Sequence, residues 1–222
     1  MKVELVSCTK PTGKLTESDI KDIKDLIAYC ARVSNPANQM NTKTTDRLLR
    51  YLKKHRHWSP FEMADITLEI ETTRDIARQM LRHRSFSFQE FSQRYSNVSE
   101  LGQLFEYSEA RWQDPHNRQN SLPLEDERTQ EWWLEYQKNV ASYSMSVYEQ
   151  AISRGIAKEV ARKVLPEGLT KSRLFMKGSI RSWIHYLEVR GPESGTQKEH
   201  MLVAEQVAKA ISQVFDFQEV ET

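Results

Sequence analysis

The sequence predicts an α+β fold, a single mostly helical domain with a small antiparallel or mixed sheet. Two segments in the first third of the 222-residue chain have the alternation of half-buried strands. The rest of the chain is dominated by segments whose apolar residues recur at helical spacing. No internal repeat or low-complexity tract divides residues 1–222, and this length is sufficient for one sizeable core. We therefore expect one domain.

The two predicted strands lie at residues 3–7 and 64–71. The first, VELVS, alternates near the N-terminus. In the second, ADITLEIE, the apolar residues Ile66, Leu68 and Ile70 stand at every second position, which is the period of a strand with one buried face.

Seven helices are predicted from apolar residues that recur every three or four positions. They cover residues 16–34, 44–56, 73–84, 127–154, 157–165, 179–190 and 196–215. We expect Thr16 or Ser18 to cap the first helix, with Ile20, Ile23 and Ile27 on its buried face.

Two segments lack a regular period and are predicted as loops. Residues 85–99 mix Ser, Phe and Gln, and we expect a loop with short extended pieces. Residues 108–126 are polar and contain two prolines, which indicates an exposed loop or a lid. Gly155 directly follows the long helix predicted at 127–154, as glycine commonly does at helix ends.

The composition argues against several classes of protein. The formal net charge is only +1, whereas a chain that coats nucleic acid usually carries a clear basic excess. No apolar run approaches the roughly 20 residues that span a membrane, and the N-terminus lacks the apolar core of a signal peptide. Cys8 and Cys30 are the only cysteines, too few for a disulfide framework or a metal-ligand set. We expect a cytoplasmic protein that binds neither nucleic acid nor membrane.

The segment from Arg74 to Arg94 departs from this balance. It contains five arginines, no lysine and two acidic residues, a local charge of +3. Arg74, Arg78 and Arg82 are four residues apart, so a helix would place them on one face. A solvated basic surface would explain the charge alone, but the guanidinium fork of arginine matches phosphate, carboxylate or an imide edge. The choice of arginine therefore favours anion recognition.

Four separate motifs resemble those of the flavin-dependent thymidylate synthases. The residues RHR at 82–84, followed after seven residues by Ser92, match the signature of that family, and HWSPFE at 57–62 precedes it as expected. Further on, EVARKVLP at 159–166 and RSWIHYLEVR at 181–190 resemble two other family segments. The resemblance covers most of residues 57–215 and implies the family fold. Met63, Gln89 and Ser179 depart from the residues often found at these positions.

The resemblance implies the reductive methylation of dUMP to dTMP in a homotetramer whose sites are shared between subunits. Methylenetetrahydrofolate would supply the carbon, FAD would carry the hydride and NADPH would reduce the flavin. It also implies a set of flavin-binding residues, with His57 placed near the flavin ring where the folate stacks. The flavin set is His57, Ser59, Arg82, His83, Arg84, Glu90, Ser179, Arg181 and His185.

The same resemblance, together with side-chain chemistry, gives the substrate residues. Arg190 is the expected catalytic residue, because a permanent cation beside the uracil imide would stabilise the negative charge that develops there. Ser92 and Arg94, with the backbone amides of Phe91 and Gln93, are expected to bind the phosphate. The complete set is Gln79, Arg82, Glu90, Phe91, Ser92, Gln93, Arg94, Arg162 and Arg190.

Two alternatives remain open from the residues, and no metal site is expected. Phe86, Phe88 and Phe91 beside arginines are compatible with an RNA-binding module that stacks bases. A flavin reductase or oxidase without methyl transfer would also use a flavin site. His55 and His57 are only two residues apart and no carboxylate or cysteine completes a metal-ligand set.

Overall fold

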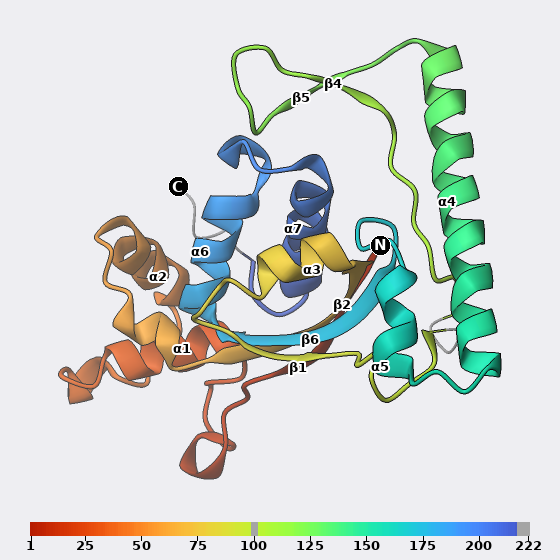
Figure 1. The fold of residues 1–222 in the computed structure, drawn as a ribbon. Coiled ribbons are helices and arrows are strands. Elements are labelled where there is room, and N and C mark those ends of the chain that lie inside the picture. The colour runs from red at the N-terminus through yellow and green to blue at the C-terminus, as the bar shows by residue number, and fades with distance from the viewer. Residues whose placement is uncertain (99–101, 217–222) are drawn as a thin grey trace.

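A four-stranded antiparallel sheet organises the chain in a computed structural model that describes residues 1–98 and 102–216. Ser99, the last residue of the loop predicted at 85–99, lies outside these ranges. The strand order is β1-β2-β6-β3, so strands distant in sequence lie side by side (Figure 1). Their bounds are β1 Lys2–Cys8, β2 Asp65–Thr73, β3 Ser87–Glu90 and β6 Lys171–Ser179. The α+β prediction and both predicted strands are confirmed, and the sheet is antiparallel.

Strand β6 was not predicted, although it occupies the middle of the sheet between β2 and β3. Its sequence KSRLFMKGS does alternate, with Ser172, Leu174 and Met176 buried and Phe175 exposed. Only two residues of its buried row, Leu174 and Met176, are strongly apolar, so the period is weak. Pairing along its whole length with β2 fixes the strand instead.

The helices have the predicted order. Their bounds are α1 Ile23–Ala31, α2 Thr45–Lys54, α3 Arg74–Met80, α4 Glu127–Ser153, α5 Lys158–Ala161, α6 Ile180–Arg190 and α7 Lys198–Ile211. Short 3₁₀ turns are η1 Gly13–Leu15, η2 Pro36–Asn38, η3 Ser59–Glu62, η5 Arg162–Val164 and η6 Pro192–Ser194. The predicted N-terminal helix starts later than expected. Asp22, and not Thr16 or Ser18, caps α1 by accepting a hydrogen bond from the Asp25 amide.

The main core lies between one face of the sheet and the helices α3, α6 and α7, which Figure 1 shows on that side. Ile66, Leu68 and Ile70 of β2 point into it, as predicted, and are fully buried. The opposite face of β6 carries charged residues that pair across the sheet, including Lys177 with Asp65 at 3.0 Å. The sheet therefore buries one face, which explains its two-residue period.

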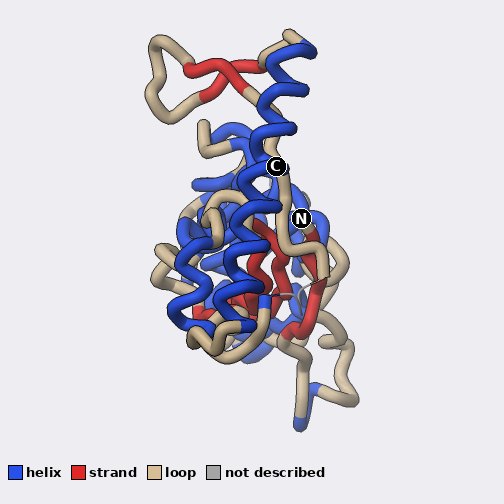
Figure 2. The backbone as a smooth tube through the Cα atoms, turned by 45° about the vertical axis from the view of Figure 1, so that its right-hand side comes forward, coloured by secondary structure: helices blue, strands red, loops and turns tan. Residues whose placement is uncertain are grey.

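The polar segment 108–126 is not wholly irregular, because it contains a short hairpin of β4 Arg111–Gln113 and β5 Ser121–Pro123. Figure 2 shows this hairpin at one end of the molecule, beside the start of α4. Two ion pairs join the segment to α7: Arg111 to Glu199 at 2.7 Å and Lys198 to Glu109 at 2.5 Å.

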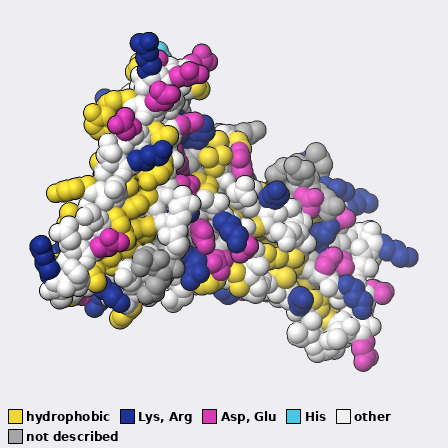
Figure 3. All heavy atoms as spheres, turned by 90° about the vertical axis from the view of Figure 1, so that its right-hand side faces the viewer, with side chains coloured by type: hydrophobic (Ala, Val, Ile, Leu, Met, Phe, Trp, Pro, Cys, Tyr) yellow, Lys and Arg dark blue, Asp and Glu magenta, His cyan; other side chains and the backbone are white. Residues whose placement is uncertain are grey.

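Helix α4 carries an exposed apolar surface, which faces the viewer in Figure 3. Tyr148 is fully buried in a small second core with Val98 and Leu104. Tyr143, in contrast, is 75% exposed. The exposed members are Trp132, Trp133, Leu134, Tyr136, Val140 and Tyr143. Among the described residues, no helix is long and apolar enough to cross a membrane.

Candidate active site

Helix α3 ends four residues earlier than predicted, and this changes where the arginines lie. The Arg82 and His83 amides bond to carbonyls only three residues back, so the chain turns tightly after Met80. The single row of three arginines expected on α3 is therefore wrong, because Arg82 lies beyond the helix. Arg74 pairs with Glu90 at 3.5 Å, and Arg78 pairs with Glu167.

The turn after α3 brings His83 to the last turn of α6. The Arg190 Nε donates to His83 Nε2 at 3.2 Å, and Arg190 Nη1 donates to Thr196 Oγ1 at 3.1 Å. These two bonds engage two of the five guanidinium N–H donors and fix the plane of the group. The predicted catalytic cation is therefore oriented before substrate binds. Its three remaining N–H donors are available to a ligand.

Burial keeps the imidazoles around Arg190 neutral. Desolvation, followed by the charge of Arg190, lowers the pKa of His83 to about 4 and that of His200 to about 3. The His83 ring lies 5.2 Å from the Tyr186 ring and 6.4 Å from the His200 ring. Burial also raises the pKa of the Tyr186 hydroxyl well above its usual value. A neutral His83 can accept the Arg190 hydrogen bond, whereas an imidazolium could not.

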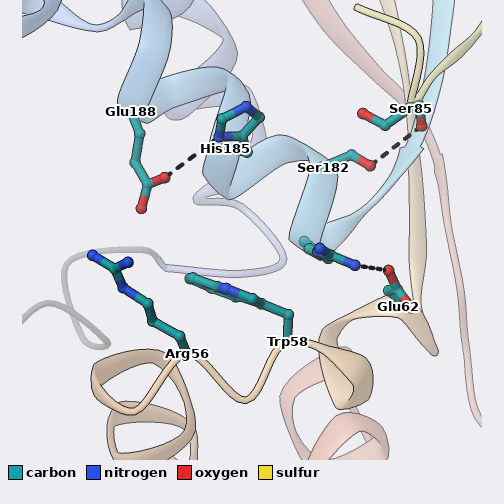
Figure 4. A pocket seen from close by; sticks show the side chains of 8 residues that line it. Arg56, Trp58, Glu62, Ser85, Ser182, His185 and Glu188 are labelled. Atoms are coloured by element: carbon teal, nitrogen blue, oxygen red, sulfur yellow. Dashed lines mark hydrogen bonds and ion pairs between the residues drawn. The ribbon is translucent and has the colours of Figure 1, made fainter.

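A pocket of about 620 Å³ lies beside the outer face of α6. Figure 4 shows Arg56 and Trp58 on one wall, facing His185 and Glu188 across the opening. The lining residues are Arg56, Trp58, Glu62, Ser85, Arg181, Ser182, His185 and Glu188. The residues from α6 recur at three- and four-residue spacing, so one polar face of the helix forms one wall. The pocket thus combines an aromatic face with cations, hydroxyl groups and the carboxylates of Glu62 and Glu188.

Arg56 reaches this pocket from a strained backbone conformation. Its φ angle is 55°, in the left-handed region that favours glycine. The amides of Arg56 and His57 bond back to the Lys53 and Leu52 carbonyls, the arrangement that ends helices with a left-handed residue. Arg56 therefore occupies a position where glycine would be less strained, while its side chain lines the pocket.

The predicted flavin residues are only partly brought together. Arg181 and His185 line the pocket, and His57 and Ser59 flank its Trp58 in the chain. Arg82 and Arg84 lie exposed in the turn between α3 and β3. The side chain of Ser179 instead caps α6, where it accepts from the Ser182 amide at 3.3 Å.

The predicted phosphate residues form a second group after β3. Arg94 pairs with Glu159 at 3.4 Å, which brings this loop to the α5–η5 segment that carries Arg162. The Ser92 hydroxyl accepts from the Arg94 amide at 3.4 Å. Glu90 accepts a 2.6 Å hydrogen bond from Ser172.

Two details of the phosphate prediction change. The Phe91 amide donates to the Arg173 carbonyl at 2.8 Å and so extends the sheet. The prediction that this amide binds the phosphate is therefore wrong. The Gln93 side chain is only 3% exposed, and its Nε2 has no hydrogen-bond partner among the described residues. An orphaned buried donor is costly, so Gln93 marks this loop as a place where a ligand or partner would be favourable.

Several residues of the site were missed. Trp58 and Glu62 lie inside the HWSPFE motif, and the polar face of α6 gave a helical signal for Ser182 and Glu188. Tyr186 lies inside the RSWIHYLEVR motif, but nothing in the sequence pointed to its buried partner His200, because a buried polar pair has no periodic signature. The site residues that the sequence did not predict are Arg56, Trp58, Glu62, Ser85, Ser182, Tyr186, Glu188, Thr196 and His200. In residues 1–98 and 102–216, no three His, Cys, Asp or Glu side chains form a metal-ligand set.

The two depressed histidine pKa values predict how stability depends on pH. Both lie below the unfolded value of 6.5, so the unfolded chain binds more protons between these limits. The free energy of unfolding should therefore be greatest above about pH 6.5 and fall as the pH drops toward 4. Urea titrations across this range would measure the slope. His200→Phe should flatten it, and an unchanged slope would contradict the neutral state of His200.

Comparisons with known proteins identify the family. The family model described as thymidylate synthase complementing protein matches residues 14–215. A flavin-dependent thymidylate synthase from Synechocystis is 52% identical over 204 residues, covering 92% of this chain and 91% of the relative. A probable flavin-dependent thymidylate synthase from Paramecium bursaria Chlorella virus 1 is 47% identical over 215 residues, covering 97% of this chain and 94% of that relative.

A solved structure agrees with this family match. A UMP/dUMP methylase from Streptomyces cacaoi, bound with 5-Br dUMP, superposes with a TM-score of 0.79 at 28% identity, covering 96% of this chain and 90% of that one. Phe86 also packs into the core against Trp183, with ring centroids 4.7 Å apart, and is not presented for base stacking. The family match and the burial of Phe86 decide against the RNA-binding alternative. The chain belongs to the flavin-dependent thymidylate synthase family.

Proposed function

We propose how the residues of this chain divide the work of its family's reaction, the flavin-dependent conversion of dUMP to dTMP. The reaction itself follows from family membership over nearly the whole chain. The observation that carries the assignment is the fixed guanidinium of Arg190, held by His83 and Thr196. We assign Arg190 to the uracil imide, where its cation stabilises the charge that develops on activation.

The pocket beside α6 is proposed to hold FAD. Its donor set fits this cofactor, because Trp58 offers an aromatic face, and Arg56 and Arg181 offer cations for a diphosphate. When bound, the flavin would supply the hydride. Arg181 and Glu62 both line the pocket and form an ion pair, which orients the Arg181 guanidinium. The exposed Arg82 and Arg84 are proposed to extend this cationic surface.

Ser92 and Arg94 are proposed to bind the dUMP phosphate, with Arg162 from the adjoining segment. Arg94 would exchange its exposed ion pair with Glu159 for the phosphate, at small cost, since exposed pairs contribute about 0–1 kcal/mol. Gln79 is proposed to contact the uracil edge. Glu90 is proposed to accept from the ribose.

NADPH and methylenetetrahydrofolate are proposed as co-substrates, in a cytoplasmic enzyme. The test is dTMP formation by the purified chain from dUMP, with each of FAD, NADPH and methylenetetrahydrofolate omitted in turn. Full dependence on all three supports the proposal. Oxidation of NADPH without dTMP formation would indicate a flavin reductase or oxidase instead.

A homotetramer with shared sites is proposed from the exposed face of α4. Trp132, Tyr136 and Tyr143 are each more than half exposed, and large aromatic residues at such density usually mark an interface. Light scattering should therefore give a mass near four times the 26.1 kDa chain. Tyr136→Glu should weaken this assembly, whereas Glu149→Gln on the same helix should not. A monomer that binds FAD tightly would contradict shared sites.

Arg56→Gly tests why a strained arginine lines the pocket. Glycine relieves the left-handed strain, so the free energy of unfolding should rise by about 0.5–1 kcal/mol. Flavin affinity should fall, because a cation leaves the pocket. Denaturant titration and flavin fluorescence would measure the two effects. Arg56→Lys, which keeps both charge and strain, should retain most of the affinity, and equal losses in the two variants would contradict a charge role.

A further inference from the structure

A continuous row of hydrogen bonds connects the hairpin segment to the buried Tyr186 in the middle of α6. Arg111 pairs with Glu199 at 2.7 Å, and Gln197 Nε2 donates to Glu199 Oε2 at 3.0 Å. Gln79 Nε2 then donates to Gln197 Oε1 at 2.8 Å. We refer to Glu199, Gln197 and Gln79, with His200 and Tyr186 beyond them, as the Glu199 relay.

The relay continues past Gln79 into the core. His200 Nδ1 lies 3.2 Å from Gln79 Oε1, and His200 Nε2 lies 3.1 Å from the Tyr186 hydroxyl. His200 and Tyr186 are both fully buried. Water therefore cannot replace either of these bonds without opening the core.

One carboxylate sets the direction of every bond in the relay. Glu199 can only accept, so Gln197 must turn its amide nitrogen toward it and its oxygen toward Gln79. Gln79 must then donate to Gln197, which leaves the Gln79 oxygen facing His200. The amide oxygen of Gln79 carries no hydrogen and can only accept, so the proton of His200 has to lie on Nδ1.

The neutral state of His200 completes the assignment. Burial, followed by Arg190 and His83, lowers its pKa to about 3, so the ring carries one proton at neutral pH. With Nδ1 protonated, Nε2 can only accept, and the Tyr186 hydroxyl must donate to it. The charge on Glu199 therefore sets the orientation of the four side chains that follow it, which are Gln197, Gln79, His200 and Tyr186.

This order leaves Gln79 with defined free capacity. One N–H of Nε2 and one lone pair of Oε1 remain, because each group uses only one bond in the relay. Gln79 is linked to Arg190 through two histidines: His200 bonds to Gln79, His83 bonds to Arg190, and the two rings have centroids 6.4 Å apart. The fixed amide therefore belongs to the same side-chain cluster as the cation assigned to the pyrimidine.

We propose that the Glu199 relay makes Gln79 selective for a pyrimidine nucleotide with an imide edge, as in uracil, over one with an aminopyrimidine edge, as in cytosine. The inference rests on the proposed contact between Gln79 and the base. Uracil places an N–H beside carbonyl oxygens, whereas cytosine places a bare ring nitrogen beside an amino group. An amide locked in one direction matches the first edge and opposes the second. His200 is thus a positioning residue, which acts through Gln79.

The test compares the dissociation constants of dUMP and dCMP, measured from the flavin spectrum of the intact enzyme. In the wild type, dUMP should bind more tightly. Glu199→Gln lets both amides turn over, so it should reduce the ratio of the dCMP and dUMP dissociation constants about tenfold. His200→Phe removes one of the two bonds that hold Gln79 but keeps Glu199, so it should reduce this ratio by less. The ratio is informative even if a variant loses affinity for both nucleotides. Glu199→Gln changes a half-buried side chain to one of the same size, so it remains a test should His200→Phe not fold.

Two controls separate the orientation of the Gln79 amide from the loss of an ion pair or of a carboxylate elsewhere on α7. Arg111→Gln breaks the ion pair with the hairpin segment but keeps the Glu199 carboxylate, so the ratio should not change. Glu205→Gln removes a carboxylate from the exposed face of α7 and should also leave it unchanged. A lower ratio in Arg111→Gln would overturn the relay in favour of hairpin anchoring.

Neutron diffraction of the wild-type protein gives a readout that does not depend on activity. A deuteron on His200 Nδ1 is expected, and one on Nε2 would overturn the relay. Unchanged ratios in both Glu199→Gln and His200→Phe would overturn the selectivity. A wild-type enzyme with no affinity for dUMP would instead contradict the proposed function, and the selectivity would fall with it, whatever the position of the deuteron.

Discussion

Replacing Arg190 with alanine should lower turnover by about 10²–10³-fold, with a much smaller change in dUMP affinity. The imide charge that the guanidinium stabilises develops only as the ring is activated, so the interaction is strongest in the transition state. Arg190 is also half-buried and held by His83 and Thr196, so water cannot supply an equally fixed donor. Single-turnover oxidation of reduced flavin, with dUMP and methylenetetrahydrofolate present, would measure the chemical step.

Two further variants make the Arg190 prediction specific. Arg190→Lys should restore little turnover, because an ammonium cannot bond to His83 and Thr196 and also present a planar fork to the imide. Arg94→Ala should instead weaken dUMP binding and leave the chemical step nearly intact, since a phosphate is bound equally in the ground and transition states. Normal turnover in Arg190→Ala, or unchanged dUMP affinity in Arg94→Ala, would show that the roles are wrongly assigned.

Trp183→Ala should cause the largest loss of stability, about 3–5 kcal/mol in the free energy of unfolding. The Trp183 ring is fully buried against Phe86 and Tyr186, and its indole N–H donates to the Ile66 carbonyl at 3.2 Å. Alanine would leave a large cavity between α6 and the sheet. Urea titration at fixed protein concentration would measure the loss.

Trp183→Ala should also lower the affinity of the pocket beside α6 for flavin. Phe86 packs closely on the sheet, because a Cβ added at Gly178 would lie only 2.4 Å from the Phe86 ring. The residue before Phe86 is Ser85, which lines the pocket. Loss of Trp183 should let Phe86 move and so lower flavin affinity. Trp183→Phe fills most of the cavity and should cost about half as much or less. Equal losses in the alanine and phenylalanine variants would assign the effect to the indole hydrogen bond.

The sequence predicted the fold class well where local patterns are strong. The alternation of Ile66, Leu68 and Ile70 defined β2, and the long helical period before Gly155 defined α4. It failed at β6, whose buried row has only two strong apolar residues. Strand β6 is stabilised by pairing with β2 and β3, which come from distant parts of the chain, and such pairing leaves little local signal.

For the site, the sequence by itself determined the family, through motifs whose residues and spacing survive in the primary structure. It therefore named Arg190, His83 and Gln79 as functional residues. Only the tertiary structure decided how they are held. The turn after α3 brings His83 to Arg190, and burial keeps His83 neutral so that it can accept that bond. The direction of Gln79 depends on Glu199 and His200 of α7, more than a hundred residues away, because hydrogen-bond polarity and desolvation exist only once the chain has folded.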